Sequence, residues 1–339
     1  MKVLAAMSGG VDSSVAAALL VEEGHDVTGV TLRLWDNPTD AGCCSVTEID
    51  DARRVTNVLG IDHLVWTFVD EFDGRVVEPY AAAHAQGLTP NPCIECNRHL
   101  KFGRLLRRAT QLGFDAVATG HHARVVTDGH HRLLRGADAR KDQSYVLYVL
   151  GQEELARCRF PVGTMTKTAV RAKAAALGLP TAEKPDSQDV CFVTTSGGRR
   201  ALLASRIPLH PGRVVDRTGA EVGRVEAVEL VTPGQRRGLG TGGGDRRYAL
   251  AVDTAARTVL VGSAADLEVD SVALDQLCWV HEPVEGEVEA QTSAHAVPVE
   301  ATFDGARVRF RGRHRRVAPG QSVVLYRGEE VLGGGIVGA

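Results

Sequence analysis

The sequence predicts an α/β protein: an N-terminal domain with a parallel sheet, followed by two smaller β-rich domains. Over the first 120 residues, short β-branched runs alternate with helical patterns, as is typical of parallel strands joined by helices. From about residue 200, helical periodicity fades and short alternating runs lie between Gly/Pro turns, as in small barrels. A strongly acidic stretch begins near residue 266. We therefore predict domains at residues 1–200, 201–268 and 269–339, the first the catalytic one.

Each element of the first domain has its own local signal. Runs of β-branched and apolar residues predict strands at 3–7, 27–34, 63–69 and 115–119. An Ala/Leu-rich pattern that stops at Gly24 predicts a helix at 12–23. Thr47 and Asp50 form a capping box, which predicts the start of a helix that ends near Gly60. Further helices are predicted at 71–86 and 97–112, with the Gly/Pro-rich stretch 87–92 as the loop between them.

Composition narrows the class of protein. The 339 residues are 44% apolar and 24% charged, which excludes disordered and collagen-like chains. No window approaches the roughly 18 uninterrupted apolar residues of a membrane span, and the N-terminus does not read as a signal peptide. We expect a cytoplasmic protein without a membrane partner. The net charge of −3, taken alone, argues against a nucleic-acid partner.

The segment 8–14, Ser-Gly-Gly-Val-Asp-Ser-Ser, lies between the first predicted strand and the first predicted helix. Its two glycines allow a phosphate to approach the backbone closely, and the helix start offers N–H groups and a positive dipole end. Neither a Walker P-loop nor a dinucleotide fingerprint is present. We predict an anion site here; the alternative is an ordinary Ser/Gly-rich turn.

Seven cysteines in a cytosolic chain are not expected to form a structural disulfide framework. Cys93 and Cys96 form a C-x-x-C pair, a spacing that suits metal binding or thiol chemistry. Cys158 and Cys278 lie in apolar sequence and are expected to be inert core thiols. The adjacent Cys43 and Cys44 are partners in such chemistry or simply a reactive loop.

Five motifs, in order along the whole chain, resemble those of the tRNA-specific 2-thiouridylase family, which belongs to the ATP pyrophosphatase (PP-loop) superfamily. They are residues 8–14, 89–97, 119–121, 141–145 and 184–192. The resemblance implies ATP-dependent 2-thiolation of the wobble uridine of tRNA. The uridine C2 oxygen is adenylated, and the sulfur of a persulfide then replaces it. It also implies Mg²⁺ with ATP, and a persulfide sulfur donor such as a cysteine desulfurase or relay protein.

The resemblance assigns roles residue by residue. Cys96 is the nucleophile, and Cys191 carries the persulfide and forms a transient disulfide with Cys96. A helix start and nearby cations predict a lowered pKa for the Cys96 thiol, in an exposed loop rather than a core. ATP-binding positions are Ala6, Met7, Ser8, Gly9, Gly10, Val11, Asp12, Ser13, Leu32 and Gly120. tRNA-binding positions are Lys141, Asp142, Gln143, Arg309, Phe310, His121 and Gln321.

One departure from the family pattern concerns Cys93, which stands where many members have an aspartate. The role of that aspartate is unfilled here or passes to Glu95 or another residue. Cys93, Cys96 and Cys191 together could ligate a 4Fe-4S cluster with one open iron, or a zinc ion with a fourth ligand. Two other functions therefore stay open: a PP-loop synthetase or amidotransferase, and a noncatalytic RNA-binding metal module.

Two basic tracts offer an RNA surface. Residues 97–111 hold five Lys/Arg and no acid, and spacings of three and four predict that most lie on one side of a helix. Residues 307–316 hold six Arg and no acid, and in a strand alternate arginines point from one face. The remaining residues then sum to −3 − 11 = −14. Solvated charged faces are the alternative for either tract.

Overall fold

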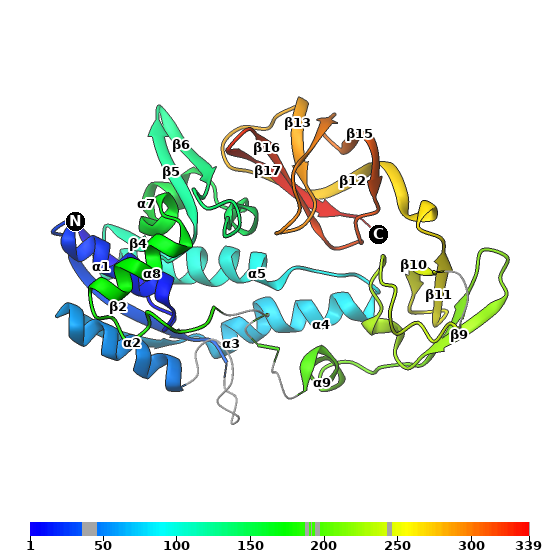
Figure 1. The fold of residues 1–339 in the computed structure, drawn as a ribbon, viewed down its shortest axis with the longest axis horizontal. Helices are drawn as coiled ribbons and strands as arrows, with labels where there is room; N and C mark the ends of the chain where they lie inside the picture. The colour runs from blue at the N-terminus through cyan, green and yellow to red at the C-terminus, as the bar shows by residue number, and fades with distance from the viewer. Residues whose placement is uncertain (36–45, 187–189, 191, 194–196, 243–245, 339) are drawn as a thin grey trace.

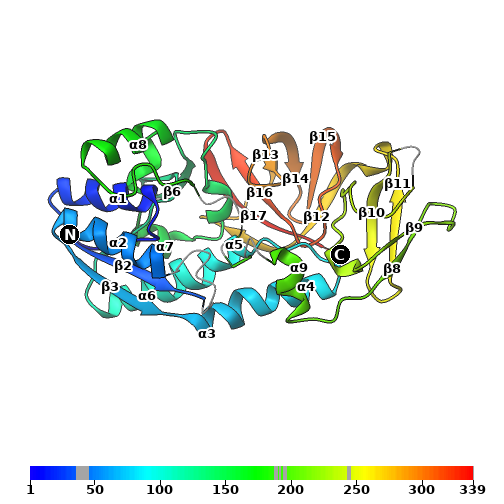
Figure 2. The same cartoon turned by 60° about the horizontal axis from the view of Figure 1, so that its bottom comes forward.

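The computed structural model describes residues 1–35, 46–186, 190, 192–193, 197–242 and 246–338. The molecule is elongated, and both ribbon views place the C-terminal barrel between the N-terminal α/β domain and the sheet that contains β10 and β11 (Figures 1 and 2). Helix α4 runs beneath the barrel toward that sheet (Figure 2). In the described residues, no helix is long and apolar enough to cross a membrane.

The N-terminal domain is built on a five-stranded sheet with the order β3-β2-β1-β4-β7, and every pairing in it is parallel. The parallel sheet predicted from the sequence is therefore confirmed. The strands are β1 (Lys2–Ala6), β2 (Asp26–Arg33), β3 (Asp62–Thr67), β4 (Ala116–Ala118) and β7 (Cys158–Arg159).

Two apolar clusters cover the two faces of this sheet, because successive strand residues point to opposite sides. Val3 and Ala5 of β1 lie in one cluster with helix α1, and Leu4 lies in the other with Phe68 and Leu105. The helices are α1 (Val11–Glu22), α2 (Val46–Leu59), α3 (Val69–Phe72), α4 (Glu78–Ala85), α5 (Pro92–Glu95), α6 (Leu105–Gln111), α7 (Gln152–Arg157) and α8 (Lys167–Ala176).

Two predicted helices begin earlier in the structure than their sequence signals indicated. The helix expected at 71–86 starts at Val69 and runs through a π-helical segment, η1 (Asp73–Val77), into α4. The helix expected at 97–112 starts at Pro92 and passes through the π-helical η2 (Cys96–Arg104) into α6. Proline suits a first helical turn, where its missing N–H has no partner to lose. Thr47 lies inside α2 rather than at its cap.

The segment after the N-terminal domain forms a four-stranded sheet with the order β10-β11-β8-β9. Its own small apolar core contains Val214, Val228 and Val259. The elements are α9 (Gly198–Ala204), β8 (Gly212–Val215), β9 (Glu221–Val225), η5 (Val228–Leu230), β10 (Tyr248–Asp253), β11 (Thr258–Gly262) and η6 (Ala265–Leu267). The predicted change to β-rich structure near residue 200 is confirmed.

The C-terminal strands β12 to β17 form a closed barrel, because β12 pairs with both β15 and β17. They are β12 (Glu268–Trp279), β13 (Gly286–Gln291), β14 (Val299–Phe303), β15 (Arg307–Arg315), β16 (Ser322–Arg327) and β17 (Glu330–Val337). A hairpin from the N-terminal part, β5 (Ala123–Asp128) and β6 (His130–Arg135), adds to the outside of β17. The sequence analysis did not foresee this hairpin. Short 3-10 segments η3 (Ser144–Leu147) and η4 (Pro161–Thr164) follow it.

Candidate active site

The strand order points to the end of β1 as a place for a ligand. The chain leaves β1 toward β2 on one side, and β4 lies on the other, so the direction of winding reverses at β1. Open parallel sheets bind ligands at the carboxyl ends of the strands where this reversal occurs. The segment 8–13 follows β1 directly, and Gly120 follows the end of β4. The predicted anion loop therefore lies at the position where the fold favours a ligand.

The loop is shaped by its own glycines and hydroxyls. Gly9 has a φ of +71°, and a Cβ there would lie 2.5 Å from the Glu48 carbonyl oxygen. The backbone N–H of Ser8 donates to Ser13 Oγ at 3.2 Å, and Ser13 Oγ donates to the Gly10 carbonyl oxygen at 3.0 Å. Gly10 is the N-cap of α1 without a side-chain cap. A loop with this backbone exposure at a helix start can hold a phosphate.

Gly120 packs directly against this loop. A Cβ at Gly120 would lie 2.5 Å from the Ser13 backbone nitrogen and 2.6 Å from the Asp12 carbonyl carbon. No larger residue fits there without moving the first turn of α1. The structure thus brings Gly120 to the predicted nucleotide loop, although it lies 107 positions after Ser13 in the chain.

The other predicted nucleotide positions line the strand side of the loop. Ala6 ends β1, and Met7 is buried with its N–H on the Val30 carbonyl oxygen at 2.8 Å. Leu32 is buried near the end of β2. Val11 is buried at the start of α1. Met7 and Val11 belong to the apolar cluster on one face of the sheet, and Ala6 and Leu32 pack in the cluster on the other face.

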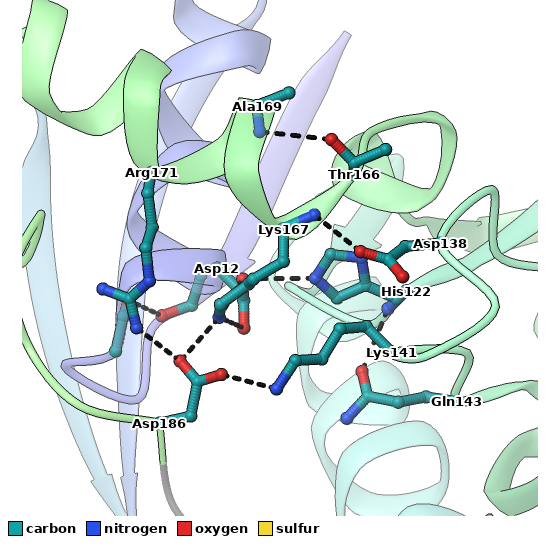
Figure 3. A network of polar contacts seen from close by, with 12 residues as sticks. Asp12, His122, Asp138, Lys141, Gln143, Thr166, Lys167, Ala169, Arg171 and Asp186 are labelled. Atoms are coloured by element: carbon teal, nitrogen blue, oxygen red, sulfur yellow. Dashed lines mark hydrogen bonds and ion pairs between the residues drawn. The ribbon is translucent and has the colours of Figure 1, made fainter.

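A network of charged side chains surrounds Asp12 (Figure 3). Lys167 Nζ contacts both Asp12 oxygens, at 2.8 and 2.7 Å, and His122 Nε2 lies 3.2 Å from Oδ1. Burial alone would raise the pKa of Asp12, but the hydrogen bonds from His122 and Lys167 hold it below its usual value. Asp12 is therefore ionised at neutral pH.

Asp186 is the second carboxylate of this network, and three cations contact it (Figure 3). Lys141 Nζ lies 2.7 Å from Oδ2, while Lys167 Nζ and Arg171 Nη2 each lie 2.8 Å from Oδ1. Burial opposes ionisation, but the bonds from Lys141 and Lys167 lower the pKa of Asp186 to about 2. Nearby, Lys184 Nζ donates to the Gly9 carbonyl oxygen at 3.0 Å and to Asp51 at 2.7 Å.

Sequence reasoning named Asp12 for the site but assigned no role to Lys167, His122 or Asp186. Lys167 lies 155 residues from Asp12, so no local spacing links the two. One signal was available, because Lys167 follows an N-cap threonine and helix starts disfavour cations. Asp186 lies within the recognised motif 184–192, but only the fold shows its partners.

The C-x-x-C thiols lie within a helix and not in the loop that the sequence predicted. The Asn91 side chain caps the helix by accepting from the Cys93 backbone N–H at 3.1 Å. Cys93 is exposed, whereas Cys96 is buried, with 7% of its surface accessible. The expectation that Cys96 is an exposed loop thiol is therefore wrong, because Pro92 starts the helix one turn early and Ile94 and Cys96 turn inward.

Cys191, the predicted persulfide carrier, lies outside the described residues, as do Cys43 and Cys44. Its neighbour Phe192 is buried in the same apolar cluster as Cys96, and Val190 packs against that cluster. The Phe192 ring lies 5.5 Å from the ring of Phe72 in an edge-to-face contact. The residues on both sides of position 191 thus pack in or against the apolar cluster that contains Cys96.

The prediction of a core thiol is confirmed for Cys158, whereas Cys278 lies at the edge of the core. Cys158 is fully buried, and this burial raises the pKa of its thiol. Cys278 is partly buried, with Sγ 3.7 Å from the Val149 carbonyl oxygen. Neither lies in the network around Asp12 and Asp186.

The three consecutive positions assigned to tRNA make contacts within the protein. Lys141 pairs with Asp186. The Asp142 side chain is 7% exposed and pairs with Arg135 at 2.9 Å. Gln143 Oε1 accepts from the His122 backbone N–H at 3.0 Å. This segment connects the β5–β6 hairpin to the network at Asp12.

His121 and Gln321 lie at two different places. His121 is buried between the rings of Phe102 and Phe160, and its Nδ1 lies 2.7 Å from Thr119 Oγ1. Burial, reinforced by the charge of Lys101, lowers its pKa well below the usual value, so the imidazole is neutral. Gln321 Nε2 donates to the Thr89 carbonyl oxygen, which connects the barrel to the loop before Cys93.

The arginine-rich tract at 307–316 forms strand β15 as far as Arg315, the conformation that the sequence analysis considered for it. In β15 the side chains of Arg309 and Arg311 are 63% and 80% exposed. Phe310 between them is buried in the barrel core and stacks on His314 at 4.2 Å. Arg315 turns away, donating to the Gly234 carbonyl oxygen at 2.7 Å. The strand offers exposed guanidiniums, whereas the Phe310 ring faces inward.

Three of the five cations in the basic tract at 97–111 contact partners within the protein. Arg108 lies over the Trp66 ring at 4.4 Å, and Arg104 pairs with Glu71 at 3.3 Å. Arg98 pairs with Glu95. The wider winding of the π-helical η2 breaks the three-and-four spacing that the prediction assumed.

The described residues offer two kinds of donor for a metal ion: the carboxylates of Asp12 and Asp186, and the thiols of Cys93 and Cys96. Within the described ranges, no three His, Cys, Asp or Glu side chains are grouped as metal ligands. Asp12 and Asp186 both contact the Lys167 ammonium group. Their carboxylate oxygens are hard donors, which fit Mg²⁺ bound together with phosphates. Cys93 and Cys96 are the described thiols of the predicted cluster, whose third ligand is Cys191.

Comparison with known proteins identifies the family. Residues 1–195 match the family model described as tRNA methyl transferase HUP domain, and residues 269–337 match an aminomethyltransferase β-barrel domain. The chain is 49% identical to the tRNA-specific 2-thiouridylase MnmA of Chloroflexus aurantiacus, covering 98% of this chain and 97% of that protein. The MnmA proteins of Roseiflexus castenholzii and Mycobacteroides abscessus are 45% and 47% identical, with at least 98% of each chain covered.

The two domain descriptions refer to methyl transfer, whereas the relatives are named for thiolation. The relatives match almost the whole chain, so they identify the family. A structure of the U34-tRNA thiolase NcsA from Methanococcus maripaludis matches at 18% identity with a TM-score of 0.38, over 61% of this chain and 63% of that one. A TM-score this low supports no conclusion about this chain. From the relatives, this chain belongs to the family of tRNA-specific 2-thiouridylases, which confirms the family that its motifs predicted and, with it, the prediction of tRNA 2-thiolation.

Proposed function

We propose that this protein is a tRNA-uridine 2-sulfurtransferase that uses ATP and a persulfide to make 2-thiouridine at the wobble position, uridine 34. The observation that carries the proposal is the pairing of an anion loop at the end of β1 with a buried Cys96 and the chain beside Cys191 in one domain. A thiolase needs both an adenylating site and two thiols. A synthetase that adenylates a small molecule needs only the first.

The adenylating half uses residues 8–13. Backbone N–H groups at the start of α1 and the hydroxyls of Ser8 and Ser13 hold the phosphates of ATP. The uridine C2 oxygen attacks the α-phosphorus, the bond to the β-phosphate breaks, and pyrophosphate leaves. Ala6, Met7, Leu32 and Gly120 flank the nucleotide. Mg²⁺ bound with ATP balances the phosphate charge, and Asp12 offers it a carboxylate.

The sulfur half uses two thiols. The terminal sulfur of a persulfide on Cys191 adds to C2 of the adenylated uridine, and AMP leaves with the oxygen. The Cys96 thiolate attacks the Cys191 sulfur, so the sulfur–sulfur bond breaks and the terminal sulfur stays on the base. A disulfide between Cys96 and Cys191 remains, and a reductant resets it. Phe192, next to Cys191 in the chain, belongs to the same buried apolar cluster as Cys96, which supports placing both thiols on one face of the sheet.

The tRNA and the sulfur donor are separate partners in this proposal. The exposed Arg309 and Arg311 of β15 suit phosphate oxygens of folded RNA. Sulfur comes from a cysteine desulfurase or a relay protein that delivers it as a persulfide. A 4Fe-4S cluster on Cys93, Cys96 and Cys191 stays a prediction, as does the cytoplasmic location.

The test uses purified protein, unmodified tRNA, ATP, Mg²⁺ and a persulfide donor, with AMP and 2-thiouridine both measured. We expect 2-thiouridine from the wild type, and none from Cys96→Ser or Cys191→Ser. Cys278→Ser serves as the matched control, because that thiol lies apart from the site, and it should behave as the wild type.

Other outcomes identify the rival functions. AMP formed without RNA and unaffected by both substitutions would indicate a small-molecule synthetase or amidotransferase. No turnover of ATP with tRNA and persulfide present would indicate a noncatalytic RNA-binding module. Normal thiolation by both variants would overturn the assignment of the two thiols.

A further inference from the structure

Lys167 places all of its hydrogen-bond donors on two carboxylates of the candidate site (Figure 3). Its Nζ lies 2.8 and 2.7 Å from the two oxygens of Asp12 and 2.8 Å from Oδ1 of Asp186. An ammonium group has three N–H donors, so these contacts use every one. Asp12 takes two of them, although a single bond would already keep the ion pair.

The backbone of Lys167 is fixed independently of this contact. Thr166 caps helix α8 by accepting from the Ala169 N–H at 3.2 Å, and the Asp138 carboxylate accepts from the Lys167 N–H at 2.9 Å. Lys167 is the first residue of α8, where the positive end of the helix dipole disfavours a cation. Helix stability therefore does not explain a lysine at this position.

The location of the ammonium does explain it. Asp12 follows Gly10 by two residues and lies in the first turn of α1, whose N–H groups form the anion site. A polyphosphate there brings negative charge beside the Asp12 carboxylate, and like charges at close range repel. Lys167 Nζ is within 2.8 Å of that carboxylate, its side chain is 12% exposed, and it lies where it can balance both.

We propose that Lys167 contacts ATP directly during adenylation: it turns one of its two donors on Asp12 to the β- or γ-phosphate and keeps the others on Asp12 and Asp186. When the bond between the α- and β-phosphates breaks, its electron pair goes to pyrophosphate, and the ammonium balances the added negative charge without giving up a proton. This inference rests on the proposed function, because it needs ATP on residues 8–13.

A purely structural role for Lys167 makes a different prediction. A lysine that only holds Asp12 and Asp186 in place supports the whole nucleotide site, so its loss weakens every nucleotide ligand. A lysine that contacts the β- or γ-phosphate affects only ligands that carry those phosphates. Pyrophosphate and AMP separate the two roles, because together they make up ATP.

The test measures pyrophosphate and AMP affinities of the full chain by calorimetry, in the presence of Mg²⁺. In Lys167→Gln we expect pyrophosphate affinity to fall roughly tenfold, as for the loss of a hydrogen bond to a charged group, and AMP affinity to stay unchanged. Lys173→Gln is the matched control, since it lies on the same helix and pairs with Glu22 instead. It should leave both affinities unchanged.

Two results would overturn the inference: unchanged pyrophosphate affinity in Lys167→Gln, or equal losses for pyrophosphate and AMP. If Lys167→Gln fails to fold because two carboxylates lose their shared cation, the same comparison is made between Asp186→Asn and the double variant with Lys167→Gln. A wild type that binds neither ligand and forms no AMP would instead overturn the proposed function.

Discussion

Gln321, in the turn before β16 of the C-terminal barrel, donates from Nε2 to the carbonyl oxygen of Thr89, in the loop that leads into the Cys93–Cys96 helix. The Thr89 N–H donates in turn to the Pro319 carbonyl oxygen at 2.8 Å. A Cβ on Gly320 would lie 2.9 Å from the Thr89 backbone nitrogen. The barrel is thus joined by backbone and side chain to the segment that positions Cys96.

This contact predicts the effect of Gln321→Ala. Removing one hydrogen bond costs about 1 kcal/mol, so we expect the single-turnover rate of thiolation to fall several-fold. ATP affinity should stay unchanged, because residues 8–13 take no part in the contact between Gln321 and Thr89. Gln111→Ala, an exposed substitution on α6, is the control. A thiolation rate equal to that of the wild type would show that the contact does not position Cys96.

The close packing of Gly120 on the phosphate loop predicts a loss of nucleotide binding in Gly120→Ala. The added methyl group would meet the Ser13 backbone nitrogen at 2.5 Å, so the first turn of α1 must shift. We expect ATP affinity to fall by tenfold or more, about 1.4 kcal/mol, by calorimetry. Gly74→Ala adds a methyl group where no atom lies within 4 Å and should bind ATP normally. Normal binding by Gly120→Ala would remove this loop from the nucleotide site.

The exposed guanidinium of Arg309 predicts a salt-dependent contribution to tRNA binding. If it contacts one phosphate, Arg309→Gln should weaken binding and lower the slope of log affinity against log salt by about 0.9. Filter binding between low and moderate salt measures this slope. Arg200→Gln removes an equally positive and exposed side chain on α9, which pairs with Glu226, and should leave the slope unchanged. An unchanged slope for Arg309→Gln would place the RNA elsewhere.

His84 predicts a pH dependence of stability. Burial, with the charge of Arg199, lowers its pKa to about 4, although its bond to the Glu229 carbonyl oxygen at 3.2 Å opposes this. Between pH 4 and 6.5 the unfolded chain therefore binds more protons, so the free energy of unfolding falls as the pH is lowered through this range. The slope from one such group is at most about 1.4 kcal/mol per pH unit.

His84→Gln should flatten this part of the stability curve, measured by urea unfolding at several pH values. The exposed His295→Gln should keep the wild-type slope. A variant at residue 84 that keeps the full slope would show that His84 is not held neutral by the packing of α4 against η5.

Local sequence signals were sufficient for β1 to β4 of the parallel sheet, which are apolar runs bounded by turn residues, but they missed the two-residue edge strand β7. In the arginine tract, alternation correctly indicated that Arg309 faces solvent once the tract is a strand, but the sequence did not establish the strand itself. Local signals failed at the start of the Cys96 helix, where Pro90 and Pro92 indicated a loop although proline at a first helical turn is favourable. There Cys96 is buried in the apolar cluster that also contains Phe72, and the long-range packing of that cluster is not expressed in local sequence spacing.

The candidate site, like the fold, could be predicted from the sequence only in part. The phosphate loop is contiguous, so residues 8–13 could be predicted from sequence alone. The Asp12–Lys167–Asp186 contacts join segments more than 150 residues apart in one case, and only the fold brings them together. For Asp142, the sequence motif suggested contact with RNA but did not indicate a partner within the protein. In the structure its side chain is mostly buried and pairs with Arg135.

The central claim, that this chain thiolates uridine 34 of tRNA through Cys96 and Cys191, is tested most directly by mass spectrometry of tRNA nucleosides. Cells that lack the protein receive the wild-type chain, Cys96→Ser or Cys191→Ser. We predict that 2-thiouridine species at position 34 are lost without the protein, return with the wild type and stay absent with either variant. Normal 2-thiouridine in cells that lack the protein, or its full return with both variants, would contradict the account.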